Sequence, residues 1–143
     1  MITPVSKIDH PEMTALWERS VRASHDFLSE SDIAEIRQEL PNYFHAVELR
    51  GWRDQSRQLL GFIGLANQTI EMLFVDADAR GQGIGKSLFE WARSQGAVRV
   101  DVNEQNPKAL NFYRNLGLTQ TSRSEVDSQG RPFPIIHLEL PIP

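Results

Sequence analysis

The stretch LFVDADARGQGIGKSLFEWA, residues 73–92, leads from an apolar strand through a glycine-rich turn into an amphipathic helix. The apolar spacing predicts a helix from about Gly83 to Gln95, with Gly96 as its left-handed cap. A strand, a glycine turn and a helix start form an anion-binding arrangement, because unpaired amides and the positive end of the helix dipole face the ligand. The alternative is a glycine-rich turn that only begins a helix.

Two familiar phosphate loops do not fit this turn. The nucleoside triphosphatase loop G-x-x-x-x-G-K-[ST] matches at residues 85–87 but has Arg80 in place of its first glycine. A dinucleotide fingerprint G-x-G-x-x-G that starts at Gly81 or Gly83 lacks its third glycine. Because no acidic strand partner that would hold a metal is evident, the turn is predicted to bind a diphosphate and not a γ-phosphate with magnesium.

The chain before this turn predicts two helices and three strands. Helical spacing and a proline suited to the first turn indicate a helix from Pro11 to about Ser24. A capping box at Ser29 and Asp32 begins a second, shorter helix, and Pro41 is expected to stop it. Strands are predicted in residues 43–51, 58–67 and 69–76, the first two joined as a hairpin by a turn at residues 51–57.

The chain after this turn predicts a strand, a helix and a closing hairpin. AVRVDVN, residues 97–103, is the strand. Asn106 and Pro107 supply the N-cap and first turn of a helix that Gly117 ends. LTQTSRSEV and FPIIHLEL form the hairpin around residues 127–130. The element order is ααβββαβαββ, a mixed sheet with helices on its faces, in the α+β (α/β three-layer) class.

The composition narrows the function classes. The 143 residues are the size of one domain, with 40% apolar and 24% charged residues and no run long enough to span a membrane. The absence of a secretory signal pattern makes a cytoplasmic location the expectation. The chain has no cysteine, which excludes a thiol nucleophile. The net charge of −4 argues against a nucleic-acid partner.

Two blocks of the sequence resemble the GNAT superfamily of acetyl-CoA-dependent N-acetyltransferases. Residues 73–92 contain that family's signature [QR]-x-x-G-x-[GA], beginning at Arg80. VDVNEQNPKALNFYRNLGL, residues 100–118, matches the family's later block N-x-x-A-x-x-[FL]-Y-x-x-x-G-[FL]. SVRASHDFL, VNEQN and RSEVDSQGRPFP look similar to the bacterial YjaB-type acetyltransferases. The resemblance implies a GNAT-like, mostly antiparallel central sheet flanked by helices, in a single domain over residues 1–143.

The resemblance implies roles for the residues of both blocks. The CoA pyrophosphate would lie on amides of the glycine loop, and the pantetheine arm would pair with the exit of the strand before it. An amide of that strand would polarise the thioester carbonyl. Tyr113 would be the general acid for the departing thiolate, and an amine would attack directly. The implied CoA-binding residues are Leu73, Phe74, Val75, Arg80, Gly81, Gln82, Gly83, Ile84, Gly85, Lys86, Ser87, Asn106 and Phe112.

The sequence offers candidates for the general base and for the residues that bind the acceptor amine. Glu71 is the acidic candidate for the base, although a solvated strand residue is an equal alternative. His25 is a candidate for catalysis and for acceptor binding, but a hydrogen-bonding group at a helix end is the commoner role. Trp17, Phe27 and Tyr43 would line an acceptor pocket, although such aromatics usually lie in the core.

Several alternatives stay open. The acceptor is a primary amine on a small molecule or on a peptide or protein, and the chain is a monomer or a homodimer. The four histidines have no ligand spacing for zinc, so no metal is expected. A non-catalytic acetyl-CoA sensor is the alternative function, and Tyr113 favours the enzyme over it.

Overall fold

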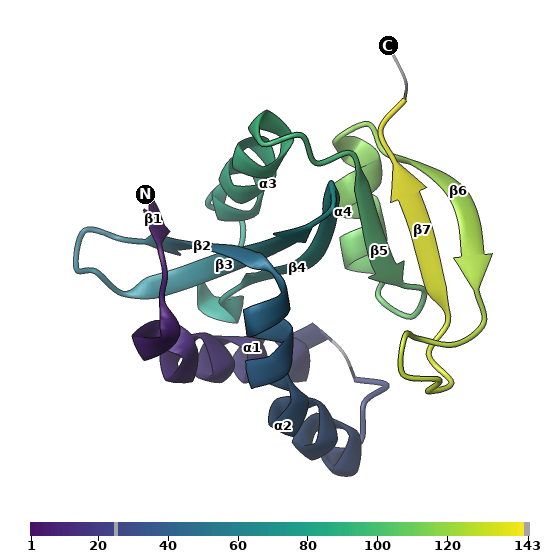
Figure 1. The fold of residues 1–143 in the computed structure, drawn as a ribbon, viewed down its shortest axis with the longest axis horizontal. Helices are drawn as coiled ribbons and strands as arrows, with labels where there is room; N and C mark the ends of the chain where they lie inside the picture. Colours follow the sequence, from purple (N-terminus) through teal and green to yellow (C-terminus); the bar gives the residue numbers. More distant parts are fainter. Residues whose placement is uncertain (25, 142–143) are drawn as a thin grey trace. The chain divides into compact units, whose positions relative to one another are not determined.

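The computed structural model describes residues 1–24 and 26–141, shown in Figure 1. The chain divides into two compact units, Met1–Ala97 and Val98–Pro143. None of the helices in the described part of the chain combines the length and apolar character that a membrane crossing requires.

In the first unit, the described residues 1–24 and 26–97 form four strands, and each pairs antiparallel with its neighbour in the order β1-β2-β3-β4. In Figure 1, α1 and α2 lie on one face of these strands and α3 on the other. The elements are β1 (Ile2–Pro4), the 3-10 turn η1 (Lys7–Asp9), α1 (His10–Ser24), α2 (Glu30–Ala46), β2 (Glu48–Arg53), β3 (Leu59–Ala66), β4 (Thr69–Val75), the 3-10 turn η2 (Ala77–Ala79) and α3 (Ile84–Ser94).

Packing on both faces of β3 makes it the centre of the first unit. On the face of α1 and α2, Phe62 is fully buried and stacks edge-on against Phe44 of α2 at 5.8 Å. On the face of α3, a Cβ at Gly61 would lie 3.0 Å from Ile84 and 3.1 Å from Leu88. A glycine at this position therefore lets α3 approach the strand closely, and α3 carries the end of the glycine loop.

The second helix extends further than the sequence predicted. Pro41 lies inside α2 and does not stop it, and residues 43–46 are helical where the start of a strand was predicted. An internal proline removes one backbone hydrogen bond and costs about 3 kcal/mol. Leu40 and Phe44, one turn apart and nearly fully buried, explain the continuation, because their burial outweighs the cost of the proline. Strand β2 then begins at Glu48, and Gly51 belongs to it and not to the turn.

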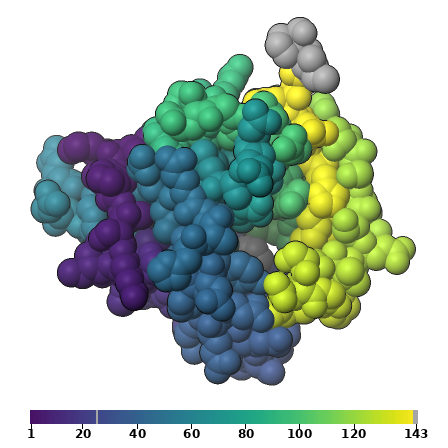
Figure 2. Space-filling model, viewed as in Figure 1, coloured from purple at the N-terminus to yellow at the C-terminus, as the bar shows by residue number. Residues whose placement is uncertain are grey.

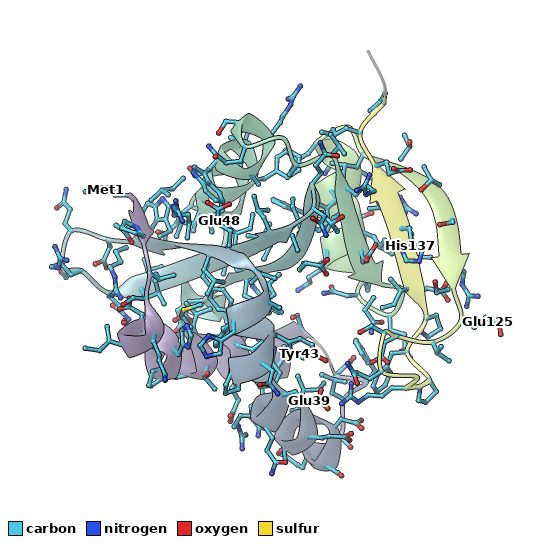
Figure 3. All side chains as sticks on the ribbon, in the orientation of Figure 1. Met1, Glu39, Tyr43, Glu48, Glu125 and His137 are labelled. Carbon is cyan, nitrogen blue, oxygen red and sulfur yellow. The ribbon has the colours of Figure 1, made fainter. Side chains whose placement is uncertain are left out.

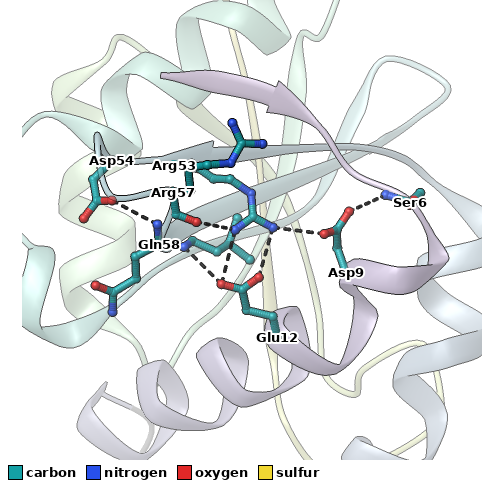
Figure 4. Close-up of polar contacts among 8 residues, drawn as sticks. Ser6, Asp9, Glu12, Arg53, Asp54, Arg57 and Gln58 are labelled. Carbon is teal, nitrogen blue, oxygen red and sulfur yellow. Dashed lines mark hydrogen bonds and ion pairs between the residues drawn. The ribbon is translucent and has the colours of Figure 1, made fainter.

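A network around Arg53 joins the start of α1 to the hairpin between β2 and β3 (Figure 4). The guanidinium donates to Asp9 at 3.0 Å, to Glu12 at 2.9 Å and to the Arg57 carbonyl at 2.7 Å. Glu12 also accepts a bond from the Leu59 amide at 3.2 Å. The hydrogen bond that Arg53 donates to Glu12, together with the nearby carboxylates, raises the pKa of Arg53, so the guanidinium stays charged. Neither β1 nor this network was predicted from the sequence.

The described residues of the second unit, 98–141, form three strands and one helix: β5 (Arg99–Asn103), α4 (Pro107–Asn115), β6 (Thr119–Ser124) and β7 (Ile135–Glu139). Strand β7 lies between β5 and β6 and pairs antiparallel with both. The predicted helix start is confirmed, because the Asn106 side chain accepts a bond from the Ala109 amide at 3.2 Å. Gly117, with φ of +100°, ends this segment as expected. Across both units, the mixed α and β class with antiparallel strands is confirmed, and β1 is the added strand.

Candidate active site

Strand β4 has an irregular backbone shortly before the glycine loop. Gly64 of β3 pairs with Met72, but the next residue, Leu65, pairs with Ile70. Glu71 is therefore the extra residue of a β-bulge, which disrupts the ladder locally and increases the twist. The exposed Glu71 side chain and the half-buried residues 73–75 follow one another along this bulged strand.

The end of β4 is held by an ion pair with α1. Asp76 is 4% exposed, and its carboxylate accepts two bonds from Arg19, at 2.8 and 3.2 Å. The same side chain caps η2 by accepting a bond from the Asp78 amide. Burial acts to raise the pKa of Asp76, but the Arg19 and amide hydrogen bonds outweigh it and hold the pKa below its usual value. The entry to the loop is therefore fixed by a charged group that stays ionised.

The second anchor of the loop is Arg80. Its guanidinium donates to the carbonyl of Ser20 at 3.3 Å, near the end of α1. Ser20 is 4% exposed, so Arg80 is anchored to a buried residue of α1. The sequence gives no sign of the roles of Arg19 and Ser20, because contacts between residues 57 and 60 positions apart leave no local signal.

The glycines give the loop a conformation that other residues adopt at a cost. Gly81 and Gly83 both have φ of +80°, in the left-handed region. Among residues 1–24 and 26–141, and apart from each glycine and its chain neighbours, no heavy atom lies within 4 Å of the position that a Cβ would take at either glycine. The loop backbone is therefore open to a ligand on the side where a side chain would otherwise stand.

The start of α3 provides the donors. The Ser87 amide bonds to the Gly83 carbonyl at 3.0 Å and makes the first bond of the helix. The amides of Ile84, Gly85 and Lys86 precede it, so they have no acceptor within the helix. Such amides, with the helix dipole behind them, bind anions and fit a pyrophosphate. Lys86 and Ser87 are exposed on the same first turn. The predicted strand, glycine turn and helix start are confirmed, whereas the ligand of the turn stays a prediction.

Tyr113 lies on α4 in the second unit. The side chain is 5% exposed, and Phe112 meets its ring edge-on at 5.0 Å. Burial raises the pKa of Tyr113 well above that of a free phenol, so the hydroxyl keeps its proton throughout the neutral range. Asn106 is buried at the N-terminus of the same helix.

The predicted acceptor residues occupy different environments. Trp17 is 3% exposed and belongs to the hydrophobic core of the first unit. Phe27 and Tyr43 are half-buried, and the Tyr43 hydroxyl donates to Glu39 at 3.1 Å, with both residues on α2 in Figure 3. His25 lies outside the described residues. Within residues 1–24 and 26–141, no three His, Asp or Glu side chains gather as metal ligands.

Comparisons with known proteins identify the family to which this fold and glycine loop belong. A family model described as an acetyltransferase (GNAT) domain matches residues 19–138. The chain is 37% identical over 145 residues to the peptidyl-lysine N-acetyltransferase YjaB of Salmonella typhimurium strain LT2, covering 99% of this chain and 100% of that protein.

Two solved structures show a similar fold. The solution structure of apo-form YjaB from Escherichia coli has a TM-score of 0.89 at 36% identity and covers 97% of this chain and 95% of that one. The crystal structure of the PaiA N-acetyltransferase from Thermoplasma acidophilum, in complex with coenzyme A, has a TM-score of 0.72 at 18% identity, with 97% and 98% of the chains covered.

Proposed function

Because this chain belongs to the GNAT family and is an N-acetyltransferase, we propose that it transfers the acetyl group of acetyl-CoA to a primary amine by direct attack on the thioester. The start of α3 carries the proposal, because amides without an acceptor in their own helix follow two left-handed glycines and an anchored arginine. The PaiA structure contains coenzyme A on the same fold, which supports the same ligand here.

The glycine loop would hold the pyrophosphate. Amides from Gln82 to Lys86 donate to the phosphate oxygens, and Lys86 and Ser87 add side-chain donors. Arg80 keeps the loop in place through its bond to Ser20, so its role is to position the amides. Asn106 and Phe112 are further residues to which the family resemblance assigns a role in CoA binding.

The exit of β4 would orient the acetyl end. Bound CoA supplies a thioester whose carbonyl is open to attack by an amine. Leu73, Phe74 and Val75 hold the pantetheine arm through backbone pairing, which leaves their side chains available for packing. A backbone amide of this strand donates to the thioester oxygen as negative charge develops there, which is worth about 10²-fold or more in rate.

Two side chains would move protons. Glu71, exposed at the bulge of β4, takes a proton from the ammonium form of the acceptor. Tyr113 gives its proton to the sulfur as the thiolate leaves. Its raised pKa keeps the hydroxyl protonated, as this role requires. His25 stays a second candidate base.

The acceptor we propose is the side chain of a lysine in a peptide or protein. The name of the Salmonella relative, a peptidyl-lysine N-acetyltransferase, supports this class of acceptor. Trp17, Phe27 and Tyr43 are the proposed acceptor-side residues. A cytoplasmic location and a single catalytic domain over residues 1–143 belong to the same proposal.

The test is acetyl transfer to matched peptides. One peptide has a blocked N-terminus and a single lysine, a second has arginine in its place, and a third has a free N-terminus without lysine. We expect thiol release from acetyl-CoA, and the added mass of one acetyl group, with the first peptide alone. Release with only the third peptide would contradict the lysine assignment. A chain that binds magnesium-ATP in calorimetry but not CoA would overturn the whole proposal.

A further inference from the structure

Strands β5 and β7 of the second unit each have a buried apolar face and an opposite, mostly polar face. Val100 and Val102 of β5 and Ile136 and Leu138 of β7 are buried. The alternate residues Arg99, Asp101 and Asn103, paired with Glu139, His137 and Ile135, therefore share the opposite face. His137 is labelled on β7 in Figure 3, and Figure 2 shows β6 and β7 at the surface in this view.

Three side chains in one row of this polar face form a hydrogen-bonded chain. His137 Nδ1 lies 2.6 Å from Asp101 Oδ1, and His137 Nε2 lies 2.7 Å from Ser124 Oγ. In the neutral tautomer with its proton on Nδ1, the imidazole donates to the carboxylate and accepts from the hydroxyl. This is the order of contacts that activates a serine in a Ser-His-Asp triad.

The strand register explains how the row forms. Asp101 is directly opposite His137 across the β5–β7 pair. Ser122 of β6 is opposite His137 on the other side, and Ser124 is two residues further along the same face. Three paired strands thus fix the carboxylate, the imidazole and the hydroxyl, which gives the constellation a rigid support.

The row is accessible to reagents. The His137 side chain is 30% exposed and that of Asp101 is 44% exposed, while Ser124 is half-buried. The proposed acetyl-transfer mechanism uses none of the three groups. A reaction at these three groups would therefore be separate from amine acetylation.

We propose that Ser124 is a covalent acyl-acceptor site, in which His137 is the general base and Asp101 orients the imidazole. Its substrate class is an activated acyl group, as an ester with a good leaving group or as a thioester. This site does not depend on the proposed amine acetylation.

The step balances as an acyl transfer. Ser124 Oγ forms a bond to the acyl carbon while its proton passes to His137 Nε2. The bond from the acyl carbon to the leaving oxygen or sulfur then breaks, and the leaving group takes the bonding electron pair together with the proton on Nε2. The products are O-acyl-Ser124 and a free phenol or thiol, with His137 neutral again.

The experiment is acetylation of the full chain by two donors in separate arms, p-nitrophenyl acetate and acetyl-CoA, without any peptide. Intact mass and peptide mapping follow the acetyl group, and hydroxylamine separates an ester, which it cleaves, from a lysine amide, which it leaves. We expect a hydroxylamine-sensitive acetyl group on Ser124 from at least one donor. His137→Gln and Asp101→Asn should slow its formation by about 10²-fold and about 10-fold, because general-base catalysis contributes at least that much.

Ser122→Ala is the matched control, since Ser122 lies on the same strand and face and should leave the rate unchanged. If a His137 variant does not fold, the wild-type chain in urea replaces it, and there the Ser124 acetylation should disappear. No acetyl group on Ser124 from either donor, or an equal rate without His137, would overturn the proposal. Failure here leaves the peptide assay unaffected, so the two proposals are separable.

Discussion

Replacing Gly83 by alanine tests the anion site at the start of α3. Gly83 has φ of +80°, and in the described part of the chain no heavy atom beyond its sequence neighbours lies within 4 Å of the added methyl group. The cost is therefore local backbone strain of about 1–2 kcal/mol. Relief of that strain turns the residue out of the left-handed region and re-aims the amides of Ile84 and Gly85. Loss of one hydrogen bond to a charged phosphate is worth about 1.5–3 kcal/mol, or about 10- to 100-fold in the Kd for CoA.

Gly96→Ala is the matched control, because it introduces the same strain elsewhere. Gly96 has φ of +95°, also with open space around its Cβ position, but it follows the opposite end of α3. Both variants should lose about 1–2 kcal/mol of unfolding free energy in urea titrations, whereas only Gly83→Ala should bind CoA weakly in calorimetry. Equal Kd values for the two variants would refute the assignment of the loop.

Three further predictions follow from single contacts. Tyr113→Phe should lower kcat by about 10-fold or more and leave the Kd for CoA unchanged. Because burial raises the pKa of the Tyr113 phenol, the pH-rate profiles of the wild type and the variant should have the same shape on the alkaline side up to pH ~9.5. An unchanged kcat would show that Tyr113 is not the general acid. Asp76→Asn should lower the unfolding free energy by about 1–2 kcal/mol at pH 7. The pKa of Asp76 is lowered in the folded chain, so its contribution is present above the unfolded pKa of about 4 and is lost as the pH falls through the folded pKa; a difference between wild type and variant that persists in acid contradicts this. Arg53→Ala should lower the unfolding free energy by about 1–2 kcal/mol, a value kept small because the paired carboxylates are partly exposed. The control is Arg57→Ala, which removes an exposed side chain. An equal loss of unfolding free energy in the two variants would show that the network contributes little.

The strand, glycine loop and helix were predictable because local chemistry decides each of them. Gly96 is predicted as a left-handed cap and has φ of +95°, and the predicted glycine turn before α3 has left-handed residues at Gly81 and Gly83. The Asn106–Pro107 pair marks a helix start, and the Asn106 side chain makes the expected cap. These turns and caps depend only on a residue and its nearest neighbours in sequence, so they can be predicted without knowledge of the tertiary structure.

The errors arose where tertiary contacts outweigh local preference. Pro41 is a strong local stop signal, yet burial of Phe44 carries α2 past it. Strand β1 is too short to have a pattern and exists because Ile2 pairs with Trp52. The Asp101–His137–Ser124 row is equally invisible in the sequence, because only the register of three strands brings these residues together.

Whether burial of Tyr113 hinders the proposed proton transfer depends on the pKa of the departing thiol as well as on the pKa of the phenol. Phenol and thiol are both neutral acids that become anions, so exclusion of water raises both pKa values. In water the transfer from a phenol, with a pKa near 10, to a thiolate, with a thiol pKa near 8.5, is uphill by about 2 kcal/mol. A raised phenol pKa therefore hinders the step only where the thiolate stays better solvated than the tyrosine. Replacing Tyr113 with a fluorinated tyrosine, which lowers the phenol pKa without removing the hydroxyl, separates the two cases. An increase in kcat indicates that the proton transfer is uphill, whereas no change indicates that the two pKa values are already matched.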